Sequence, residues 1–359
     1  MNEFTQDDQP HDSPRAARWM LFLPLAIGAV LVVIYWFVWS WGAGVMRDEI
    51  ASWKSTQESA GLTIEHGPMK VTGFPFVLRA ELPDPYVADP TAGWAWQAEM
   101  LYADTPPLSP NRIILSPEGA QQLNLTEDNG PNIWDLTAET FRVSLAETKT
   151  GLDIRGLVAR PEETDGREVA AVEIGSVMAN TMITDNPENG RSGDLGRFAL
   201  SARDIVFEKA DGTPPLAFAE IDLSVVATAI STVMSRQAGE SNVAAWQRGN
   251  GELVIEGLRL VVSDGRQAIP TQLRANGTLV LDKEHYPAGT VELTLKDHLA
   301  LVSVLREQGL ITQEEAEQAD NALRFLSQAM GEEIKASLQL RGGKLRLGPV
   351  AIMDLDKVG

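Results

Sequence analysis

The sequence predicts a mainly β protein of the α+β class: one N-terminal transmembrane helix, then curved antiparallel sheets with a C-terminal helical hairpin packed on sheet. Three observations predict this fold. An uncharged apolar run lies near the start of the chain, alternation of apolar and polar residues recurs along most of the remainder, and helical periodicity returns only near the end. With 359 residues, 44% of them apolar, the chain is long enough for a membrane segment and a sizeable folded body.

The apolar run extends from Trp19 to Trp41 and contains no charged residue. At about 1.5 Å per residue, a helix of this length spans roughly 34 Å, slightly more than the roughly 30 Å hydrocarbon core of a bilayer. Aromatic side chains suited to headgroup depth stand at its two ends: Trp19, Tyr35, Trp36, Trp39 and Trp41. We therefore expect a membrane anchor over residues 19–41, with the lipid bilayer as its partner.

The alternative to an anchor is a cleaved signal peptide, because Gly42, Ala43 and Gly44 offer small residues at a processing site. The apolar region of a signal peptide is usually about 7 to 15 residues, so this run is too long for that class. Arg15 and Arg18 precede it, and basic residues stay on the cytoplasmic side. Residues 1–18 are thus expected to be a cytoplasmic tail of a single-pass inner-membrane protein whose body is periplasmic.

The charge of the chain excludes several classes of function. The formal net charge is −20, of which the tail carries −2, so the rest of the chain carries −18. Such an acidic body is a poor match for nucleic acid, whose phosphates are neutralised by Lys and Arg. The absence of Cys excludes disulfides, thiol catalysis and thiolate metal sites.

The body is expected to have two parts, a β-rich lobe over residues 46–235 and a second β-rich lobe over 236–359. Helical spacing continues from Met46 to Ser59 and stops before Gly61. Short turns such as Thr148–Gly151 and Gly342–Gly343 link the alternating runs, which indicates antiparallel hairpins. A short helical turn is expected over Asn242–Arg248. The helical hairpin is placed at 299–330, with helices over Leu299–Gln308 and, after a capping box at Thr312 and Glu315, up to Met330.

Large apolar residues alternate on two of the expected strands. Phe76 and Leu78 open one strand, and Trp94, Trp96 and Met100 share one face of another. Residues of these types fill a protein core, and they equally line a groove for acyl chains. The sequence leaves the two interpretations open.

The sequence predicts no catalytic, cofactor-binding or metal-binding residue. The four His residues lie at no ligand spacing, and there is no Gly-x-Ser-x-Gly, P-loop, dinucleotide or His-Glu-x-x-His motif. A calcium loop at Asp185, Asn189 and Asp194 departs from the twelve-residue pattern, with Pro187 at the third position and Gly196 at the last. Whether the protein is an enzyme stays open, although these observations favour a non-enzyme.

Several short motifs resemble those of a known family in their order along the chain. They are Gly73-Phe74-Pro75-Phe76, the strand at Trp96, Trp246 to Gly251, Gly277-Thr278-Leu279, Pro287-Ala288-Gly289 and Leu347-Gly348-Pro349. The chain resembles the domain of unknown function 2125 family, and this resemblance implies an alphaproteobacterial envelope protein with an N-terminal membrane segment. It implies no activity. The general plan is also similar to that of AsmA-type envelope proteins, in which one anchor precedes a long sheet implicated in lipid traffic.

Three functions are compatible with these observations. The preferred hypothesis is a non-enzymatic envelope protein that binds or shields lipid or a partner protein in the periplasm. The second is an envelope hydrolase that acts on glycan or lipid through Asp and Glu. The third is a structural subunit of an inner-membrane complex. The shape of the body separates them, because an apolar face left open favours lipid and a filled core does not.

Overall fold

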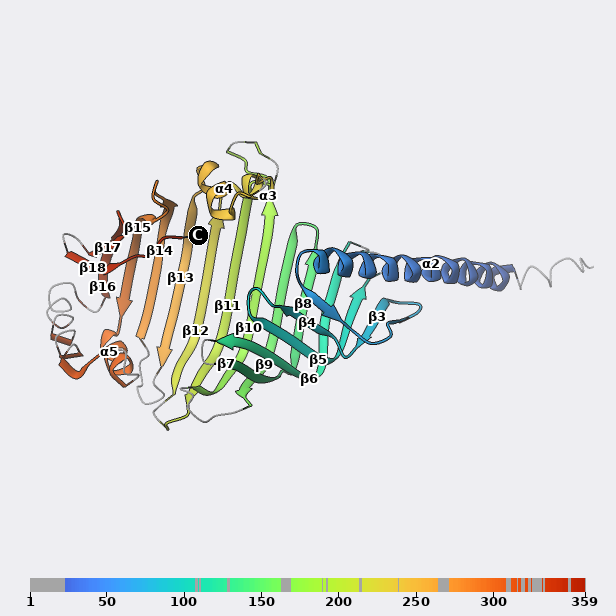
Figure 1. Cartoon of the computed structure of the whole chain (residues 1–359), viewed down its shortest axis with the longest axis horizontal. Coiled ribbons are helices and arrows are strands. Elements are labelled where there is room, and N and C mark those ends of the chain that lie inside the picture. Colours follow the sequence, from blue (N-terminus) through green and yellow to red (C-terminus); the bar gives the residue numbers. More distant parts are fainter. Residues whose placement is uncertain are drawn as a thin grey trace, which may run out of the picture.

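The structure, a computed structural model, describes residues 23–358 except 107–108, 110, 128–129, 163–168, 189, 192, 213–214, 238, 264–270, 308–310, 315, 318–319, 322–323, 325–330, 332 and 348–349. The predicted tail and the first four residues of the predicted anchor lie outside this part. The protein is mostly β, with one N-terminal apolar helix and an antiparallel sheet, which confirms the predicted fold class (Figure 1).

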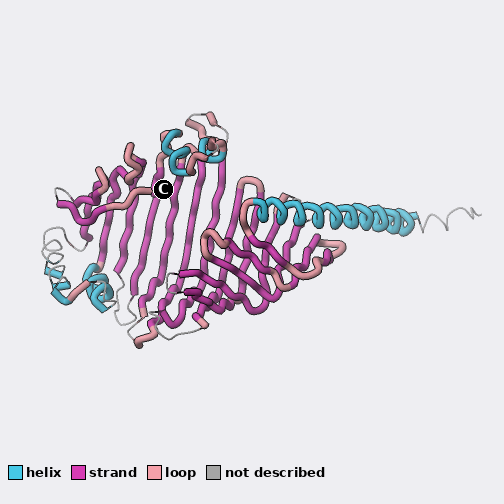
Figure 2. The backbone as a smooth tube through the Cα atoms, in the orientation of Figure 1, coloured by secondary structure: helices cyan, strands magenta, loops and turns pink. Residues whose placement is uncertain are grey.

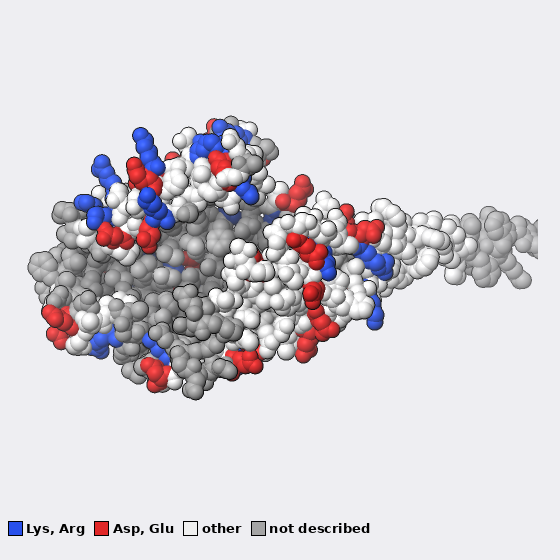
Figure 3. Space-filling model, in the orientation of Figure 1, with Lys and Arg blue, Asp and Glu red and all other residues white. Residues whose placement is uncertain are grey.

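Helix α2 runs without interruption from Leu23 to Ser59. Its first half is exposed and apolar, and the first charged residue in it is Arg47. Figure 3 shows its outer part without charged side chains. Among the described residues, α2 is the one helix long and apolar enough to cross a membrane. It ends at Ser59 as predicted, and Gly61 follows in the left-handed region at φ 103°.

The second half of α2 packs on the sheet. It contacts β1 (Thr63–Glu65) and β3 (Leu78–Pro83). Met46 and Ile50 lie against a buried cluster of Ala80, Leu82 and Ala103. The helix that leaves the body is therefore also part of its core, so the sheet cannot reorient freely about the anchor.

The strands nearest α2 form a branched part of the sheet. β5 (Trp94–Thr105) pairs at one end with β4 (Tyr86–Asp89) and at the other with β3, which also pairs with β2 (Lys70–Thr72). β6 (Ile113–Glu127) pairs with β5, and then with both β7 (Gly130–Thr137) and β8 (Thr140–Ala146). β9 (Lys149–Pro161) pairs with β7 and β8 and leads into the remainder of the sheet.

From β9 onward each strand pairs antiparallel with the next, as a meander. These strands are β10 (Val169–Thr184), β11 (Leu195–Lys209), β12 (Leu216–Ala227), β13 (Leu253–Ser263), β14 (Thr271–Leu281), β15 (Pro287–Lys296), β16 (Glu333–Leu340), β17 (Lys344–Leu347) and β18 (Val350–Asp354). Figure 2 shows the longest of them side by side as one broad sheet. The expected hairpins are present at the β8–β9 and β16–β17 turns.

Three short helices lie at the ends of the long strands. α3 (Ile230–Met234) and α4 (Asn242–Arg248) connect β12 to β13 at one end, and α5 (His298–Glu307) follows β15 at the other (Figure 1). α4 and α5 confirm two of the predicted helices. The second helix of the predicted hairpin falls largely outside the described residues, although those described between 313 and 324 are helical.

The predicted lobe boundary at 235/236 falls between α3 and α4. Strands β12 and β13, one on each side of it, pair over most of their length, so the sheet is continuous there. The two lobes themselves stay a prediction.

Among the described residues, the largest side chains with under 2% exposure are Thr271 and Asp194. Most large apolar side chains of the sheet are therefore only half-buried.

Candidate functional site

One face of the sheet carries uninterrupted rows of apolar side chains. The register joins nine residues from β8 to β16, each directly opposite the next, into a row that we name the first apolar row: Phe141, Ile154, Val177, Ala202, Ile221, Leu260, Leu273, Leu295 and Ile334. Residues paired across strands point to the same face. Because strands lie about 4.8 Å apart, the eight steps of the row span about 38 Å.

Two residues further along each strand, the same pairings form a second row. The second apolar row consists of Val143, Leu152, Ala179, Leu200, Leu223, Leu258, Ala275, Leu293 and Ala336. Neither row contains a polar side chain. Together, the two rows define what we call the apolar face, a strip of about 38 Å by 13 Å, on the order of 500 Å².

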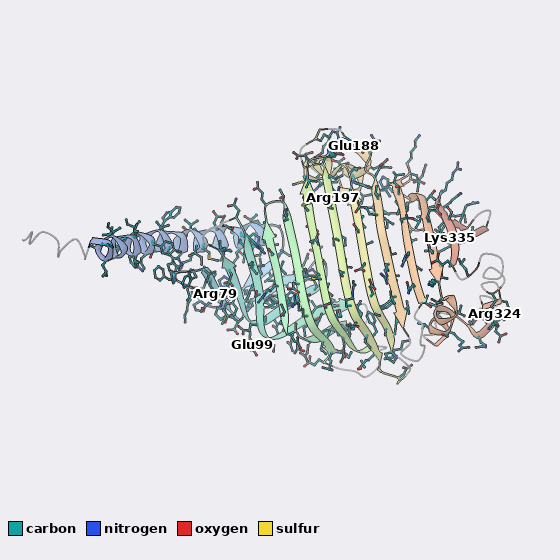
Figure 4. The ribbon with its side chains drawn as sticks, turned by 180° about the vertical axis from the view of Figure 1, so that it is seen from behind. Arg79, Glu99, Glu188, Arg197, Arg324 and Lys335 are labelled. Carbon is teal, nitrogen blue, oxygen red and sulfur yellow. The ribbon has the colours of Figure 1, made fainter. Side chains whose placement is uncertain are left out.

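The residues between the two rows point to the opposite side of the sheet. They are Arg142, Asp153, Met178, Ser201, Asp222, Arg259, Arg274, Thr294 and Lys335, and eight of these nine are polar. Figure 4 shows the sheet from behind and labels Arg197 and Lys335, which both belong to this polar face. Side chains in a strand alternate between faces, so this separation of apolar from polar is a property of the sequence.

The apolar face is only partly buried. In the first apolar row Ile154, Ala202, Leu295 and Ile334 are buried. In the second apolar row Ala275 is buried, whereas Leu200, Leu223 and Leu258 are half-buried. Full burial of a sheet face requires a second layer of structure. In the described part of the chain, the close backbone contacts of β10–β16 are mainly with their neighbours in the sheet, and α3, α4 and α5 lie at the strand ends (Figure 1). Soluble monomers rarely expose apolar patches above a few hundred Å² without a function.

One end of the apolar face is closed by α3 and α4. A cavity of about 350 Å³ lies between these helices and the strand ends, and it is lined by Val233, Val243 and Trp246 together with Leu253, Leu279 and Leu281. Leu253 and Leu279 are paired across β13 and β14 and continue the apolar face toward α4. The cavity is therefore an apolar pocket at the end of the strip.

The motif from Trp246 to Gly251 builds this closed end. The Trp246 indole Nε1 donates a hydrogen bond of 2.8 Å to the Thr228 carbonyl at the end of β12. Its ring lies over Gly251, where an added Cβ would come within 2.2 Å of the indole. Gly251 is thus required for the ring to reach the strand end, and the motif has a structural role at the α4–β13 junction.

The polar face holds a network of ion pairs rather than free charges. Arg203 forms two hydrogen bonds, of 2.9 and 3.2 Å, to the carboxylate of Asp222 and lies 3.4 Å from Glu220. Glu220 also pairs with Arg259 at 3.3 Å. Two of these residues, Asp222 and Arg259, line a shallow depression of about 800 Å³ over β10–β15. Arg203, Asp222, Glu220 and Arg259 are thus paired with one another.

The pKa of Asp222 is lowered to about 2, first because of its hydrogen bonds with Arg203. The pKa of Glu240 is likewise lowered, to about 2, by Arg248. Each described carboxyl group whose pKa departs from its ordinary value is shifted downward. A general acid at neutral pH needs a pKa raised toward 7, so these carboxylates are suited to ion pairing and not to acid catalysis.

Comparison with known proteins identifies the family to which the chain belongs. The DUF2125 family, described as an uncharacterized protein conserved in bacteria, matches residues 39–356. The chain belongs to this family. No curated protein and no solved structure matches the chain. The resemblance inferred from the motifs is confirmed for DUF2125, and the likeness to AsmA-type proteins stays a prediction.

Two of the glycine motifs quoted for DUF2125 face each other across β14 and β15. Gly289 pairs with Leu279, and Gly277 pairs with Val291. An added Cβ at Gly277 would lie 2.3 Å from the Thr290 carbonyl oxygen. These glycines permit close approach of two backbones and carry no chemistry. Residues 348 and 349 of the last motif lie outside the described part.

The predicted anchor residues of this DUF2125 protein divide into two groups. Trp36 and Trp41 are exposed, at 49% and 73%. Tyr35 and Trp39 instead contact the loop between β2 and β3, through hydrogen bonds to the Pro75 and Val77 carbonyls. Trp19 lies outside the described residues. Apart from the two Phe residues beside Pro75, no sequence pattern indicated a contact between the anchor and a loop some 40 residues later.

The residues predicted for an apolar groove or core lie in a loop and on two strands, β3 and β5. Phe76 lies before β3, in the loop, and is 86% exposed. Leu78 opens β3 and reaches toward Gly42 of α2. Trp94, Trp96 and Met100 lie on β5. The buried residues of this strand are Ala98, Ala103 and Thr105, and the step from Ala98 to Ala103 is an odd number of residues. The two-residue alternation that placed Trp94, Trp96 and Met100 on one face is therefore not kept along the whole strand. The apolar face of β8–β16 was missed as a site because its residues are ordinary aliphatics.

The loop from Asp185 to Gly196, which departs from the calcium-binding pattern, is used for local hydrogen bonds. The Asp194 carboxylate is 1% exposed and accepts a 2.6 Å hydrogen bond from Ser231 at the start of α3. Asp185 accepts a hydrogen bond from the backbone N–H of Gly193. Asn189 lies outside the described residues. Among the residues that are described, no three His, Asp or Glu side chains group as metal ligands.

Proposed function

We propose that this DUF2125 protein is a single-pass inner-membrane protein whose periplasmic body binds phospholipid acyl chains on the apolar face and shields them from water. The observation that carries the proposal is the pair of apolar rows, each across nine strands, in which most leucines are half-buried. An acyl chain laid on such a strip removes apolar surface from water on both partners, which is favourable by about 25 cal/mol per Å².

The composition of the apolar face favours alkyl chains over a protein partner. Binding hot spots between proteins are enriched in Trp, Tyr and Arg, and Tyr and Trp add polar contacts that fix orientation. The two apolar rows contain none of these three residue types, and Phe141 is their one aromatic residue. A surface made almost entirely of Leu, Ile, Val and Ala offers area without directional contacts. That is what a fluid hydrocarbon chain requires.

The proposed orientation of the chain across the membrane, and the proposal that this membrane is the inner one, rest on the sequence. Arg15 and Arg18 precede the apolar run, which favours a cytoplasmic N-terminus, and the acidic body is suited to an aqueous compartment. The structure supports retention of the anchor, because α2 is continuous through Gly42–Gly44 and Ala43 is only 3% exposed. A cleaved signal peptide needs an accessible processing site at this point.

The experiment is to purify the full chain in mild detergent, exchange it into a delipidating detergent, and analyse the retained lipid by mass spectrometry. The proposal predicts phospholipid in a defined ratio to protein after exchange. A full chain that retains no phospholipid, and also fails to bind it when it is added back, would refute the proposal. If cross-linking then recovers one dominant membrane protein, the structural-subunit hypothesis would replace it.

A further inference from the structure

The loop between β2 and β3 exposes two large aromatic side chains beside the membrane helix. We call residues Gly73–Val77 the aromatic loop; its sequence is Gly-Phe-Pro-Phe-Val. Phe74 is 42% exposed, and Phe76 is 86% exposed, more than Trp41 at 73% in the apolar part of α2. Phe side chains are usually buried in folded proteins, so a Phe this exposed to water in an ordered loop is unusual.

The aromatic loop is docked on α2 by the residues expected at headgroup depth. The Tyr35 hydroxyl donates a hydrogen bond to the Pro75 carbonyl, and the Trp39 Nε1 donates one of 3.1 Å to the Val77 carbonyl. The ring of Phe74 packs against both aromatics, with ring centroids 5.9 Å from Tyr35 and 5.7 Å from Trp39. Tyr35 and Trp39 are one helical turn apart, so the loop lies along a single face of the helix.

The depth of these contacts follows from the length of the apolar run. If the helix begins at Trp19, as the sequence predicts, a rise of about 1.5 Å per residue places Tyr35 roughly 24 Å and Trp39 roughly 30 Å from the start of the apolar run. A bilayer core of about 30 Å therefore ends close to Trp39. Tyr and Trp concentrate at this boundary between acyl chains and headgroups. A loop fixed to both residues must lie at the same level.

The backbone of the aromatic loop is prepared for a medium poor in water. Pro75 has no N–H, and the N–H groups of Phe76 and Val77 each donate a 3.0 Å hydrogen bond to the Gly73 carbonyl. The carbonyls of Pro75 and Val77 are the ones bound by α2. Gly73 has a φ of 96°, and an added Cβ there would lie 2.5 Å from Val77. Backbone at membrane depth has to satisfy its polar groups within the protein.

We propose that the aromatic loop is a second membrane contact, in which Phe76 inserts into the boundary between acyl chains and headgroups of the same bilayer that α2 crosses. The partner is the lipid surface. Two attachment points, α2 and the loop, fix the tilt of the sheet edge at β2 and β3 relative to the bilayer, whereas α2 alone could tilt in the bilayer together with the body. This inference depends on α2 crossing the bilayer and is independent of lipid binding on the apolar face.

The absence of Cys allows a direct test with single-cysteine variants. The full chain is reconstituted into phosphatidylethanolamine–phosphatidylglycerol vesicles with Phe76→Cys or Met234→Cys, each labelled with a polarity-sensitive fluorophore. Met234 is the matched control, since it is an apolar side chain 69% exposed on α3, away from the anchor. The proposal predicts a blue-shifted emission at position 76 that is quenched by lipids with a nitroxide high on the acyl chain, and neither effect at position 234.

Two results would overturn the proposal. A label at position 76 as exposed to water and as unquenched as the label at 234 would show that the loop stands clear of the bilayer. A blue-shifted label that nitroxide lipids do not quench would show that protein, not lipid, covers the loop. Denaturation of the Phe76→Ser chain serves as the check on folding, and we expect its midpoint to match wild type because the ring makes little contact with the body.

Discussion

Replacing Leu223 with Asn places one polar side chain at the centre of the apolar face. Leu223 lies on β12 in the second apolar row, directly between Leu200 and Leu258, and is half-buried. The matched control is Met178→Asn, which makes an apolar-to-Asn change on the polar face, where Met178 is 52% exposed. Both substitutions are expected to preserve the strand backbone, and the side chains that they remove, Leu and Met, are similar in size.

The expected effect follows from what bound lipid would cover. Full burial of a Leu side chain is worth about 1.5–3 kcal/mol, and roughly half is already realised in the sheet, so lipid contact supplies about 1 kcal/mol. The Asn amide would be covered without a hydrogen-bond partner, which costs about 1 kcal/mol more. A total of about 2 kcal/mol corresponds to a roughly 30-fold weaker Kd for Leu223→Asn. Met178→Asn should leave the Kd unchanged.

The assay is a titration of the full chain in detergent with a phospholipid that carries a fluorescent acyl chain, accompanied by chemical denaturation to verify folding of each variant. A folded Leu223→Asn variant that binds as tightly as wild type would show that lipid does not lie on the apolar face. A Met178→Asn variant that loses as much affinity as Leu223→Asn would also contradict the proposal, since binding would then not distinguish the two faces.

Three further predictions concern the ion pairs, the closed end and the anchor. Asp222→Asn should lower the free energy of unfolding at neutral pH by about 1 kcal/mol, a value reduced for the exposure of the pair with Arg203. Because the pKa of Asp222 is lowered to about 2, the difference from wild type should persist above pH 4 and vanish as the pH falls toward 2, and a difference independent of pH would contradict this. Trp246→Phe should cost about 1–3 kcal/mol in denaturant titration, since the Thr228 carbonyl loses its donor, and an unchanged midpoint would exclude that role. Intact mass spectrometry of the protein isolated from membranes should include residues 19–41; a mature N-terminus near Ala43 would instead identify a signal peptide.

Much of the fold was predictable because it depends on local patterns. The uncharged run gave α2, the Gly at position 61 marked its end, and Gly342–Gly343 marked the β16–β17 hairpin. Period-two alternation identified strands, since the faces of this sheet differ so strongly in polarity. These signals act within a few residues of one another, so tertiary structure does not alter them.

The candidate site was not predictable for the opposite reason. Leu200, Leu223 and Leu258 are unremarkable in the sequence, and only the register places them side by side in one row. Whether an apolar strand face is covered depends on which other elements pack on it, and that is a long-range property. The attention given to Trp94 and Trp96 followed residue size, whereas the site is made of aliphatics of ordinary size.

The aromatic loop shows the same limit at a smaller scale. Alternation placed Phe76 at the start of a strand with Leu78, but β3 begins only at Leu78, because Gly73 and Pro75 turn the chain before it. The contacts of Pro75 and Val77 with Tyr35 and Trp39 join residues about 40 positions apart. No local pattern encodes such a contact.

The central claim is that lipid acyl chains lie on the apolar face. Photo-crosslinking tests it most directly: the full chain is reconstituted with a phospholipid that carries a diazirine near the end of one acyl chain, irradiated, and digested for peptide mapping. If acyl chains lie on the apolar face, attachment is expected on the second apolar row, at strands β10–β15, in addition to α2. Attachment confined to α2 and the aromatic loop would contradict it.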